Sequence, residues 1–297
     1  MFARPGLPKF EYVRAQTPKQ VSELLSIGDA RAMLGGTDLI TQMRDDVFRP
    51  NVVVDVKHLP GMSEISDTPS GLRIGAAVTM NEIVENPLIA KRYSVLAQAA
   101  ETVGTYQLRN RATIGGNICN ASPVADSTPA LNAVQAIIEI NGLRGKRELG
   151  IDEFITGPGF TALEPDEFVT AILLPPAIEG SVGKYEKLGR TRMGDLAVVS
   201  VAVVAHPMSD CMSGYNFTIA LGSVTATPIR AYQAENYLRD NPPGEESFRR
   251  AADMAEQASS PISDVRAGDL YQRKMINTFT KRALSAAWSA LSNRGDA

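Results

Sequence analysis

Residues 113–129 read TIGGNICNASPVADSTP and place two adjacent glycines, Gly115 and Gly116, among hydroxyl, amide and carboxylate side chains. Such a segment can wrap closely around a polar ligand, and Asp126 is a suitable acceptor for ribose hydroxyls. The surrounding segment 104–129 has neither helical nor strand periodicity, which is typical of an ordered binding loop. An Ω-loop whose polar side chains cap its own backbone is the alternative.

A second glycine pair lies upstream, in the sequence AMLGGTDL at 32–39. Gly35 and Gly36 follow a strand that the pattern predicts at 31–34, so backbone amides there can converge on an anion, with the Thr37 hydroxyl as a further donor. An ordinary β-turn after a strand would have the same sequence. Neither pair has the GxGxxG spacing of a Rossmann fold or the GxxxxGK[ST] spacing of a P-loop. Two separate glycine loops instead indicate a ligand with an extended diphosphate, held between two lobes.

Cysteine and histidine are scarce, which restricts the chemistry of the chain. Its two cysteines, Cys119 and Cys211, lie far apart, so they form neither a CxxC pair nor a metal site of their own. Its two histidines, His58 and His206, are too few for a multi-histidine metal centre, and they disfavour a Ser-His-Asp or Cys-His triad. The pattern favours chemistry carried by a cofactor, with Cys119 as a small buried filler.

The charge and hydropathy of the chain exclude several classes of protein. The net charge of −3 argues against a nucleic-acid-binding protein, which would need a dense basic face. The sequence contains no run of about 18 apolar residues, and its N-terminal stretch lacks the basic start and apolar core of a signal peptide. The expected location is therefore the cytoplasm, without a transmembrane segment.

Turn and periodicity signals divide the chain into three parts. Residues 1–57 form a small α/β lobe, and residues 58–176 form a second lobe that ends at Pro175 and Pro176. Residues 177–297 form a C-terminal α+β domain. The predicted strands cover 10–13, 31–34, 51–56, 72–78, 136–140, 167–174, 197–205 and 215–221, and the predicted helices cover 18–28, a segment capped by Thr79, 88–103, 231–238, 245–258 and 269–291. The last helix is expected to pack within its domain through Tyr271, Met275, Thr278, Phe279, Ala283, Ala286 and Ala290.

Four motifs in a fixed order give a more specific indication. They are GGTDL near residue 36, TIGGN near residue 115 with Pro123 and Asp126 following, DEFVTAILLP at 166–175, and KYEKLGRTRMGDLAVVSVAV at 184–203. Together they resemble the FAD-binding medium subunit of the molybdenum hydroxylases, the flavoprotein subunits of carbon monoxide dehydrogenases and xanthine dehydrogenases. The likeness covers essentially the whole chain. It implies an α+β fold, with a two-lobed PCMH-type FAD-binding domain followed by a C-terminal α+β domain of antiparallel strands and helices.

The resemblance also implies where FAD would bind. The first loop would wrap the diphosphate with backbone amides, and the second would close over it from the neighbouring lobe. The first loop consists of Ala32, Met33, Leu34, Gly35, Gly36, Thr37, Asp38 and Leu39, and the second comprises Ala112, Thr113, Ile114, Gly115, Gly116, Asn117 and Asn120.

Five further positions match residues that family members place around FAD. Asp126 would hold the ribose of the adenosine half, and Phe168 and Val169 lie on the strand used near the adenine end. Val103 would pack against the isoalloxazine ring without the full stacking of the aromatic residue that some relatives have there. Lys187 matches a lysine close to the flavin ring system.

Lys187 has a physical rationale as well, because a cation near the flavin N1/C2 carbonyl edge would stabilise the anionic reduced flavin and raise its potential. The alternative is an exposed charge at a strand end, in a charge run with Lys184, Arg190 and Arg192. The two arginines could equally bind the phosphates of a pyridine nucleotide or contact a partner subunit.

The family assignment implies a larger complex. A molybdopterin-containing large subunit would oxidise the substrate, and a small subunit with two [2Fe-2S] clusters would relay electrons to the flavin of this chain, which would pass them to NAD+ or a quinone. A dimer of heterotrimers is the expected assembly. This role needs no catalytic acid-base pair and no metal ligands in the chain itself, and no cysteine-rich insertion for a [4Fe-4S] cluster is present. The alternatives are a free-standing flavoprotein reductase of the same fold and a noncatalytic scaffold.

Overall fold

The computed structural model describes residues 6–191 and 194–295, and its N-terminal part is a three-stranded parallel sheet. The strand order is β1-β3-β2, formed by β1 (Glu11–Arg14), β3 (Val52–Asp55) and β2 (Ala30–Met33). Helix α1 (Pro18–Ser26) connects β1 to β2, and α2 (Leu39–Arg44) follows β2. The Thr17 hydroxyl accepts a hydrogen bond from the Gln20 amide at 3.2 Å, which confirms the predicted helix cap.

The second lobe is built on a five-stranded antiparallel sheet of order β4-β5-β10-β6-β7. Its strands are β4 (Ile65–Thr68), β5 (Gly71–Gly75), β10 (Phe168–Leu174), β6 (Ile137–Gly142) and β7 (Gly145–Gly150). Helices and a two-stranded ribbon surround it: α3 (Met80–Glu85), α4 (Pro87–Arg92), α5 (Ser94–Glu101), α6 (Tyr106–Arg109), α7 (Ile114–Cys119), α8 (Ser127–Ala133), α9 (Ile151–Phe154), β8 (Ile155–Gly157) and β9 (Phe160–Thr161). The buried residues of both lobes form one hydrophobic cluster.

Two sequence-based expectations for this lobe are wrong. The single helix predicted at 88–103 is two helices, because the chain leaves helical geometry at Tyr93 (φ −132°, ψ 47°), whose hydroxyl donates to the Pro175 carbonyl at 2.7 Å. The segment 104–129, predicted as an ordered loop without helices or strands, contains α6, α7 and the start of α8. Helices this short span too few turns for a 3.6-residue periodicity to emerge, and only the cap residues Thr105 and Thr113 indicate them.

The C-terminal domain is a four-stranded antiparallel sheet with helices on one face. Its strands follow the order β11 (Val182–Leu188), β12 (Val199–Pro207), β13 (Tyr215–Gly222) and β14 (Ile229–Arg230), and its helices are α10 (Tyr232–Asp240), α11 (Glu245–Ala258) and α12 (Asp269–Gly295). The inner side of α12 agrees in part with the predicted one. Phe279 and Ala283 are buried as expected, whereas Tyr271 is half exposed. Ile276, Thr280 and Ala287 are fully buried and were not predicted. The domain as a whole confirms the predicted α+β class.

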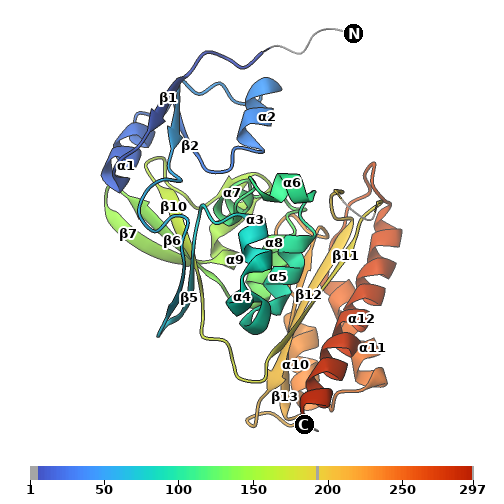
Figure 1. The fold of residues 1–297 in the computed structure, drawn as a ribbon. Coiled ribbons are helices and arrows are strands. Elements are labelled where there is room, and N and C mark those ends of the chain that lie inside the picture. The colour runs from blue at the N-terminus through green and yellow to red at the C-terminus, as the bar shows by residue number, and fades with distance from the viewer. Residues whose placement is uncertain (1–5, 192–193, 296–297) are drawn as a thin grey trace.

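The C-terminal sheet lies between helices of two different domains (Figure 1). Side chains alternate along a strand, so Val201 and Val203 of β12 face the cluster formed with α10, α11 and α12, while Ala202 between them joins the cluster of the N-terminal lobes. Small residues on that second face let α5 and α8 approach closely. A Cβ at Gly222 would lie 2.4 Å from Pro129 Cγ.

Candidate functional site

A cavity of about 720 Å³ lies between the three-stranded sheet and the second lobe. Both glycine loops line it. From the first loop come Ala32, Met33, Leu34, Gly35, Gly36, Thr37, Asp38 and Leu39, and from the second come Ala112, Thr113, Gly116, Asn117 and Asn120, with Phe168 and Val169 of β10 alongside. The structure therefore brings together residues that are up to 137 positions apart in the sequence.

The two loops also touch each other. Gly36 has a φ of +76°, which favours glycine, and a Cβ at Gly35 would lie 1.9 Å from the carbonyl oxygen of Arg111. Only a residue without a side chain fits at this contact. The first loop is therefore held against the residue that precedes Ala112 and Thr113.

The first loop contains backbone amides that are available to bind an anion. Within residues 6–191 and 194–295, the amides of Gly35, Gly36, Thr37 and Asp38 donate to no backbone carbonyl. Asp38 is the N-cap residue of α2 and makes no side-chain capping bond. Unpaired amides that follow a strand and precede a helix are a common binding site for phosphate groups.

The amides of the second loop are already used. Ile114 donates to the Val78 carbonyl at 3.0 Å, and Gly115 donates to the Ala76 carbonyl at 2.9 Å. Gly115 also packs on Ala76, where an added Cβ would lie 2.6 Å from the alanine Cβ. These two residues attach α7 to the second lobe, so their amides are not available to a ligand.

The cavity wall at the second loop is instead formed by Gly116 and two asparagines. The Gly116 amide donates to the Thr113 hydroxyl at 3.1 Å, which caps α7. Asn117 lines the cavity, and the Asn120 side-chain oxygen accepts from Gln42 Nε2 of the first lobe at 3.2 Å. The two lobes are thus joined by a hydrogen bond at the cavity wall.

Sequence reasoning missed part of the cavity wall. There the Arg31 guanidinium lies 4.9 Å from the ring centroid of Phe48, and Phe160, which is 70% exposed, lines the wall with its neighbours in 159–165. The GPG sequence before Phe160 is a turn signal that could have drawn attention to this segment. Other unpredicted lining residues are Leu25, Gly28, Ala30, Gln42, Val56, Cys119 and Glu167.

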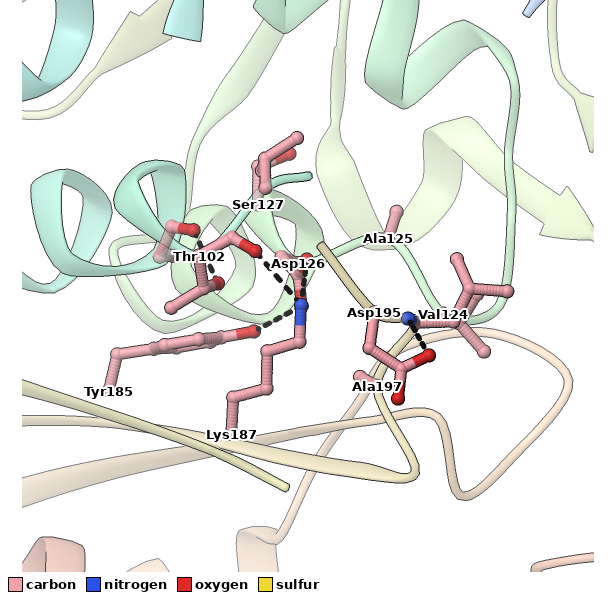
Figure 2. A network of polar contacts seen from close by, with 12 residues as sticks. Thr102, Val124, Ala125, Asp126, Ser127, Tyr185, Lys187, Asp195 and Ala197 are labelled. Carbon is pink, nitrogen blue, oxygen red and sulfur yellow. Dashed lines mark hydrogen bonds and ion pairs between the residues drawn. The ribbon is translucent and has the colours of Figure 1, made fainter. Parts of the chain in front are cut away.

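Five predicted site residues do not line the cavity: Val103, Ile114, Gly115, Asp126 and Lys187. Val103 and Ile114 are buried in the hydrophobic cluster of the N-terminal lobes. Asp126 and Lys187 meet across the boundary with the C-terminal domain, where Lys187 Nζ lies 2.7 Å from Asp126 Oδ2 (Figure 2).

Two family models match this chain in sequence. The FAD-binding domain in molybdopterin dehydrogenase matches residues 8–177, and the carbon monoxide dehydrogenase flavoprotein C-terminal domain matches residues 184–287. The chain belongs to this flavoprotein family.

Its relatives are similar along their whole length. Carbon monoxide dehydrogenase from Hydrogenophaga pseudoflava, in a structure that lacks the Mo-pyranopterin moiety of the molybdenum cofactor, is 33% identical, with a TM-score of 0.90 over 95% of this chain and 98% of that one. Quinoline 2-oxidoreductase from Pseudomonas putida 86 is 26% identical, with a TM-score of 0.89 over 97% and 100% of the two chains. A putative xanthine dehydrogenase FAD-binding subunit of Escherichia coli (strain K12) is 32% identical over 94% of this chain and 96% of the relative.

These matches confirm the family, the FAD cofactor and the oxidoreductase class that the sequence predicts. The described residues of this flavoprotein contain no helix that is long and apolar enough to cross a membrane.

The residues of the flavoprotein's cavity fit FAD. Its volume lies within the range of about 300 to 1,000 Å³ that is typical of ligand pockets. Free amides at 35–38 suit a diphosphate, and Phe48, Phe160 and Phe168 offer apolar and aromatic surface to a planar ring. Burial raises the pKa of the Cys119 thiol to about 12, so this cavity residue stays protonated, as expected of a filler.

In the buried ion pair between Asp126 and Lys187, burial affects the pKa of Asp126 more strongly than the charge of its partner does. Burial raises the pKa of Asp126 to about 6, although the Lys187 ammonium and the Tyr185 hydroxyl both favour the carboxylate. Tyr185 donates to Asp126 Oδ1 at 3.2 Å, and Lys187 also donates to the Thr102 carbonyl at 3.0 Å. The Lys187 side chain is only 10% exposed. The alternative of an exposed charge at a strand end is therefore wrong.

Proposed function

We propose that this chain holds one FAD in the cavity between its two N-terminal lobes and acts as the electron-transfer subunit of a molybdenum-containing hydroxylase or dehydrogenase. The proposal depends mainly on one observation: two glycine loops from separate lobes line the same cavity and touch at Gly35 and Arg111. Bound FAD would supply the ability to accept electrons singly and to release them in pairs. The chain would bind, orient and shield this group.

Different residues would contact the diphosphate of FAD and its adenine and flavin rings. The amides of 35–38 would bind the diphosphate, because they carry the unpaired donors. Phe168 and Val169 would contact the adenine end, together with Phe48. Among the second-loop residues, Gly116 and Asn117 would cover the diphosphate through their exposed faces.

For Val103, Asp126 and Lys187 we propose contacts with the part of FAD that reaches the boundary with the C-terminal domain. Asp126 and Lys187 lie 2.7 Å apart, so they would serve the same end of the molecule, and the separate roles that the resemblance implies, at the adenosine ribose and at the flavin ring, do not both fit. Asp126 already accepts hydrogen bonds from Tyr185 and Lys187, and its carboxylate has lone pairs left for a further hydroxyl donor. Lys187 would stabilise negative charge on the flavin ring. Its pairing with Asp126 moderates that effect, because the two opposite charges partly cancel at a distance.

The partners and the acceptor are part of the same proposal. A small subunit with two [2Fe-2S] clusters would deliver electrons that a molybdopterin-containing large subunit takes from the substrate, and NAD+ or a quinone would receive them. We also propose a cytoplasmic dimer of heterotrimers, and domain limits of 1–57, 58–176 and 177–297. The relatives named as medium chains and FAD-binding subunits support a multi-subunit assembly.

Purification of the chain from its native source tests the function. We expect a yellow flavin absorbance and copurification with a brown, molybdenum-containing pair of subunits, and rapid bleaching of the flavin when the substrate of the complex is added without oxygen. A colourless chain would favour the scaffold alternative. A yellow chain that reduces its substrate without any partner would favour the free-standing reductase.

A further inference from the structure

Strand β11 is the edge of the C-terminal sheet, and side chains of α5 pair with its outward main-chain groups. Gln98 Nε2 donates to the Gly183 carbonyl at 3.1 Å, and the Tyr185 amide donates to Gln98 Oε1 at 3.0 Å. The Gly183 amide donates to the Ser94 hydroxyl at 3.2 Å. One glutamine thus presents both a donor and an acceptor to the strand, as a neighbouring strand would.

The spacing of the two elements explains why this pairing continues. Four residues of a helix advance about 6 Å, and two residues of a strand advance about 6.6 Å, so alternate residues of β11 meet every fourth residue of α5. At the third position the roles are reversed: the Lys187 side chain donates through Nζ to the carbonyl of Thr102, the residue that caps α5. We call the six residues Ser94, Gln98, Thr102, Gly183, Tyr185 and Lys187 the helix–strand ladder.

The ladder requires an unusually close approach of the two elements. A Cβ at Gly183 would lie 2.6 Å from the Val95 amide nitrogen, so only glycine fits there. Gly183 and Tyr185 are buried, and Gln98 is half-buried between α5 and β11. The ladder therefore fixes both the distance and the register between the two domains.

The last contact of the ladder leads to the cavity wall. Lys187 pairs with Asp126 at 2.7 Å, and the next residue, Ser127, donates from its hydroxyl to Asn117 Oδ1 at 2.6 Å. Asn117 lines the cavity. A continuous series of contacts thus runs from Gln98 through β11 to the candidate cofactor site. Figure 2 shows the part of it that joins Thr102, Lys187 and Asp126.

We infer that Gln98 is a positioning residue: it sets the register of β11 against the FAD-binding domain so that Lys187 reaches Asp126, and it thereby couples the C-terminal domain to the cavity wall. The first part is independent of any ligand. The second part rests on the proposed function, because it concerns FAD affinity.

Selective acylation of lysines in the full-length chain without FAD, followed by mass spectrometry, tests the first part. Loss of two hydrogen bonds in Gln98→Leu should make Lys187 react about tenfold faster near pH 8. Lys57, which pairs with Asp55 in the first lobe, should keep its rate and thereby exclude general unfolding. Glu101→Gln, an exposed change on the same helix, is the matched control. A folded Gln98→Leu variant with unchanged Lys187 reactivity would overturn the inference.

A second variant keeps the test valid if Gln98→Leu does not fold. In Gln98→Glu an ionised carboxylate would replace the donor that faces the Gly183 carbonyl, whereas a protonated carboxyl restores it. Hydrogen exchange in peptides of β11, corrected for its intrinsic pH dependence, should be fast near pH 8 and move toward the wild-type level at about pH 4, below the ordinary glutamate pKa of about 4.3. Equal exchange at both values of pH would contradict a donor role for Gln98.

FAD titration of the same chains tests the second part. Gln98→Leu should bind FAD about tenfold more weakly than wild type and Glu101→Gln. Faster Lys187 acylation with unchanged FAD affinity would overturn the coupling to the cavity. A wild-type chain that binds no FAD would refute the proposed function instead, and the acylation result would still decide the role of Gln98.

Discussion

Gly35 and Gly115 are both needed as glycines, but only one of them borders the cavity. Gly35 lines it and abuts Arg111, whereas Gly115 is pressed against Ala76 behind the cavity wall. The sequence alone does not distinguish the roles of the two glycine pairs. Their different tasks follow from the atoms that a Cβ would meet.

Gly116 is the glycine of the second pair that faces the cavity, and its replacement by valine should block FAD. The added side chain would occupy the cavity wall and disturb the Thr113 cap, which lies 2.9 Å from the position of a Cβ. Loss of this cap costs about 1 kcal/mol, too little to unfold a chain of this size. We expect folded, colourless protein, measured by circular dichroism and flavin absorbance. Full flavin occupancy would count against the assignment of this loop.

Asp126 makes stability depend on pH in a direction opposite to that of an ordinary ion-paired carboxyl. Its pKa is raised from 3.8 to about 6 in the folded chain, so between these values the folded state binds more protons than the unfolded state. Its contribution to stability therefore falls as the pH rises through this window, with a slope of up to about 1.4 kcal/mol per pH unit.

Chemical unfolding at several pH values, for wild type and Asp126→Asn, measures this contribution. The difference between their free energies of unfolding should change between about pH 4 and pH 6 and level off above that range, because only wild type titrates there. A difference that does not change with pH would show that the carboxyl keeps its ordinary pKa.

At the scale of elements, the sequence predicts the buried central strands, but it misses edge strands of the second lobe and of the C-terminal sheet. Central strands such as β10 and β12 are rich in buried apolar residues, and both were expected. The unpredicted β4, β7 and β11 are all edge strands, whose polar and charged side chains do not show a strong hydrophobic pattern. Helices of four to six residues are missed for a related reason, since they span too few turns.

Gly183 allows a test of the close packing at one of these edges. Gly183→Ala would place a Cβ 2.6 Å from the backbone of Val95, and such overpacking costs about 1 to 3 kcal/mol. We expect a lower free energy of unfolding by this amount and faster proteolysis of the segment between β10 and β11. Gly157→Ala, whose Cβ would meet no atom closer than 3.9 Å, should be within about 0.5 kcal/mol of wild type. Equal stability of the two variants would disprove the close approach.

For the molecule as a whole, the N-terminal lobes and the C-terminal domain share a hydrophobic cluster. Tyr185, Ala202 and Ala220 of the C-terminal sheet belong to the cluster of the N-terminal lobes. A fragment of residues 1–176 would therefore expose the faces of α5 and α8 that this sheet covers.

Size-exclusion chromatography and binding of an apolar fluorescent dye test this dependence. The fragment 1–176 should bind more dye and associate more than the full chain at equal concentration. A monomeric fragment with the melting temperature of the full chain would contradict it.

The sequence predicts most of the segments that line the candidate site, but not the hydrogen bonds that these segments make. The first loop is a local feature, so strand and glycines can be recognised together in 31–36. The hydrogen-bond partners of the second loop cannot be recognised from the local sequence, because the carbonyls of Ala76 and Val78 come from a distant segment. Phe48 and Phe160, which also line the cavity, lie in distant segments that no local pattern connects.

The attachment of α7 to the second lobe makes the two walls of the cavity unequal. With the amides of Ile114 and Gly115 bound to the backbone at 76–78, this wall holds its shape whether or not a guest molecule is inside. At the opposite wall, the carbonyls of Gly36 and Asp38 accept from the amides of Ile40 and Gln42, but the amides of 35–38 donate to no backbone carbonyl among the described residues and would gain partners when an anion binds. We therefore expect substitutions at 35–38 to change how tightly FAD is held while the wall formed by α7 keeps its shape.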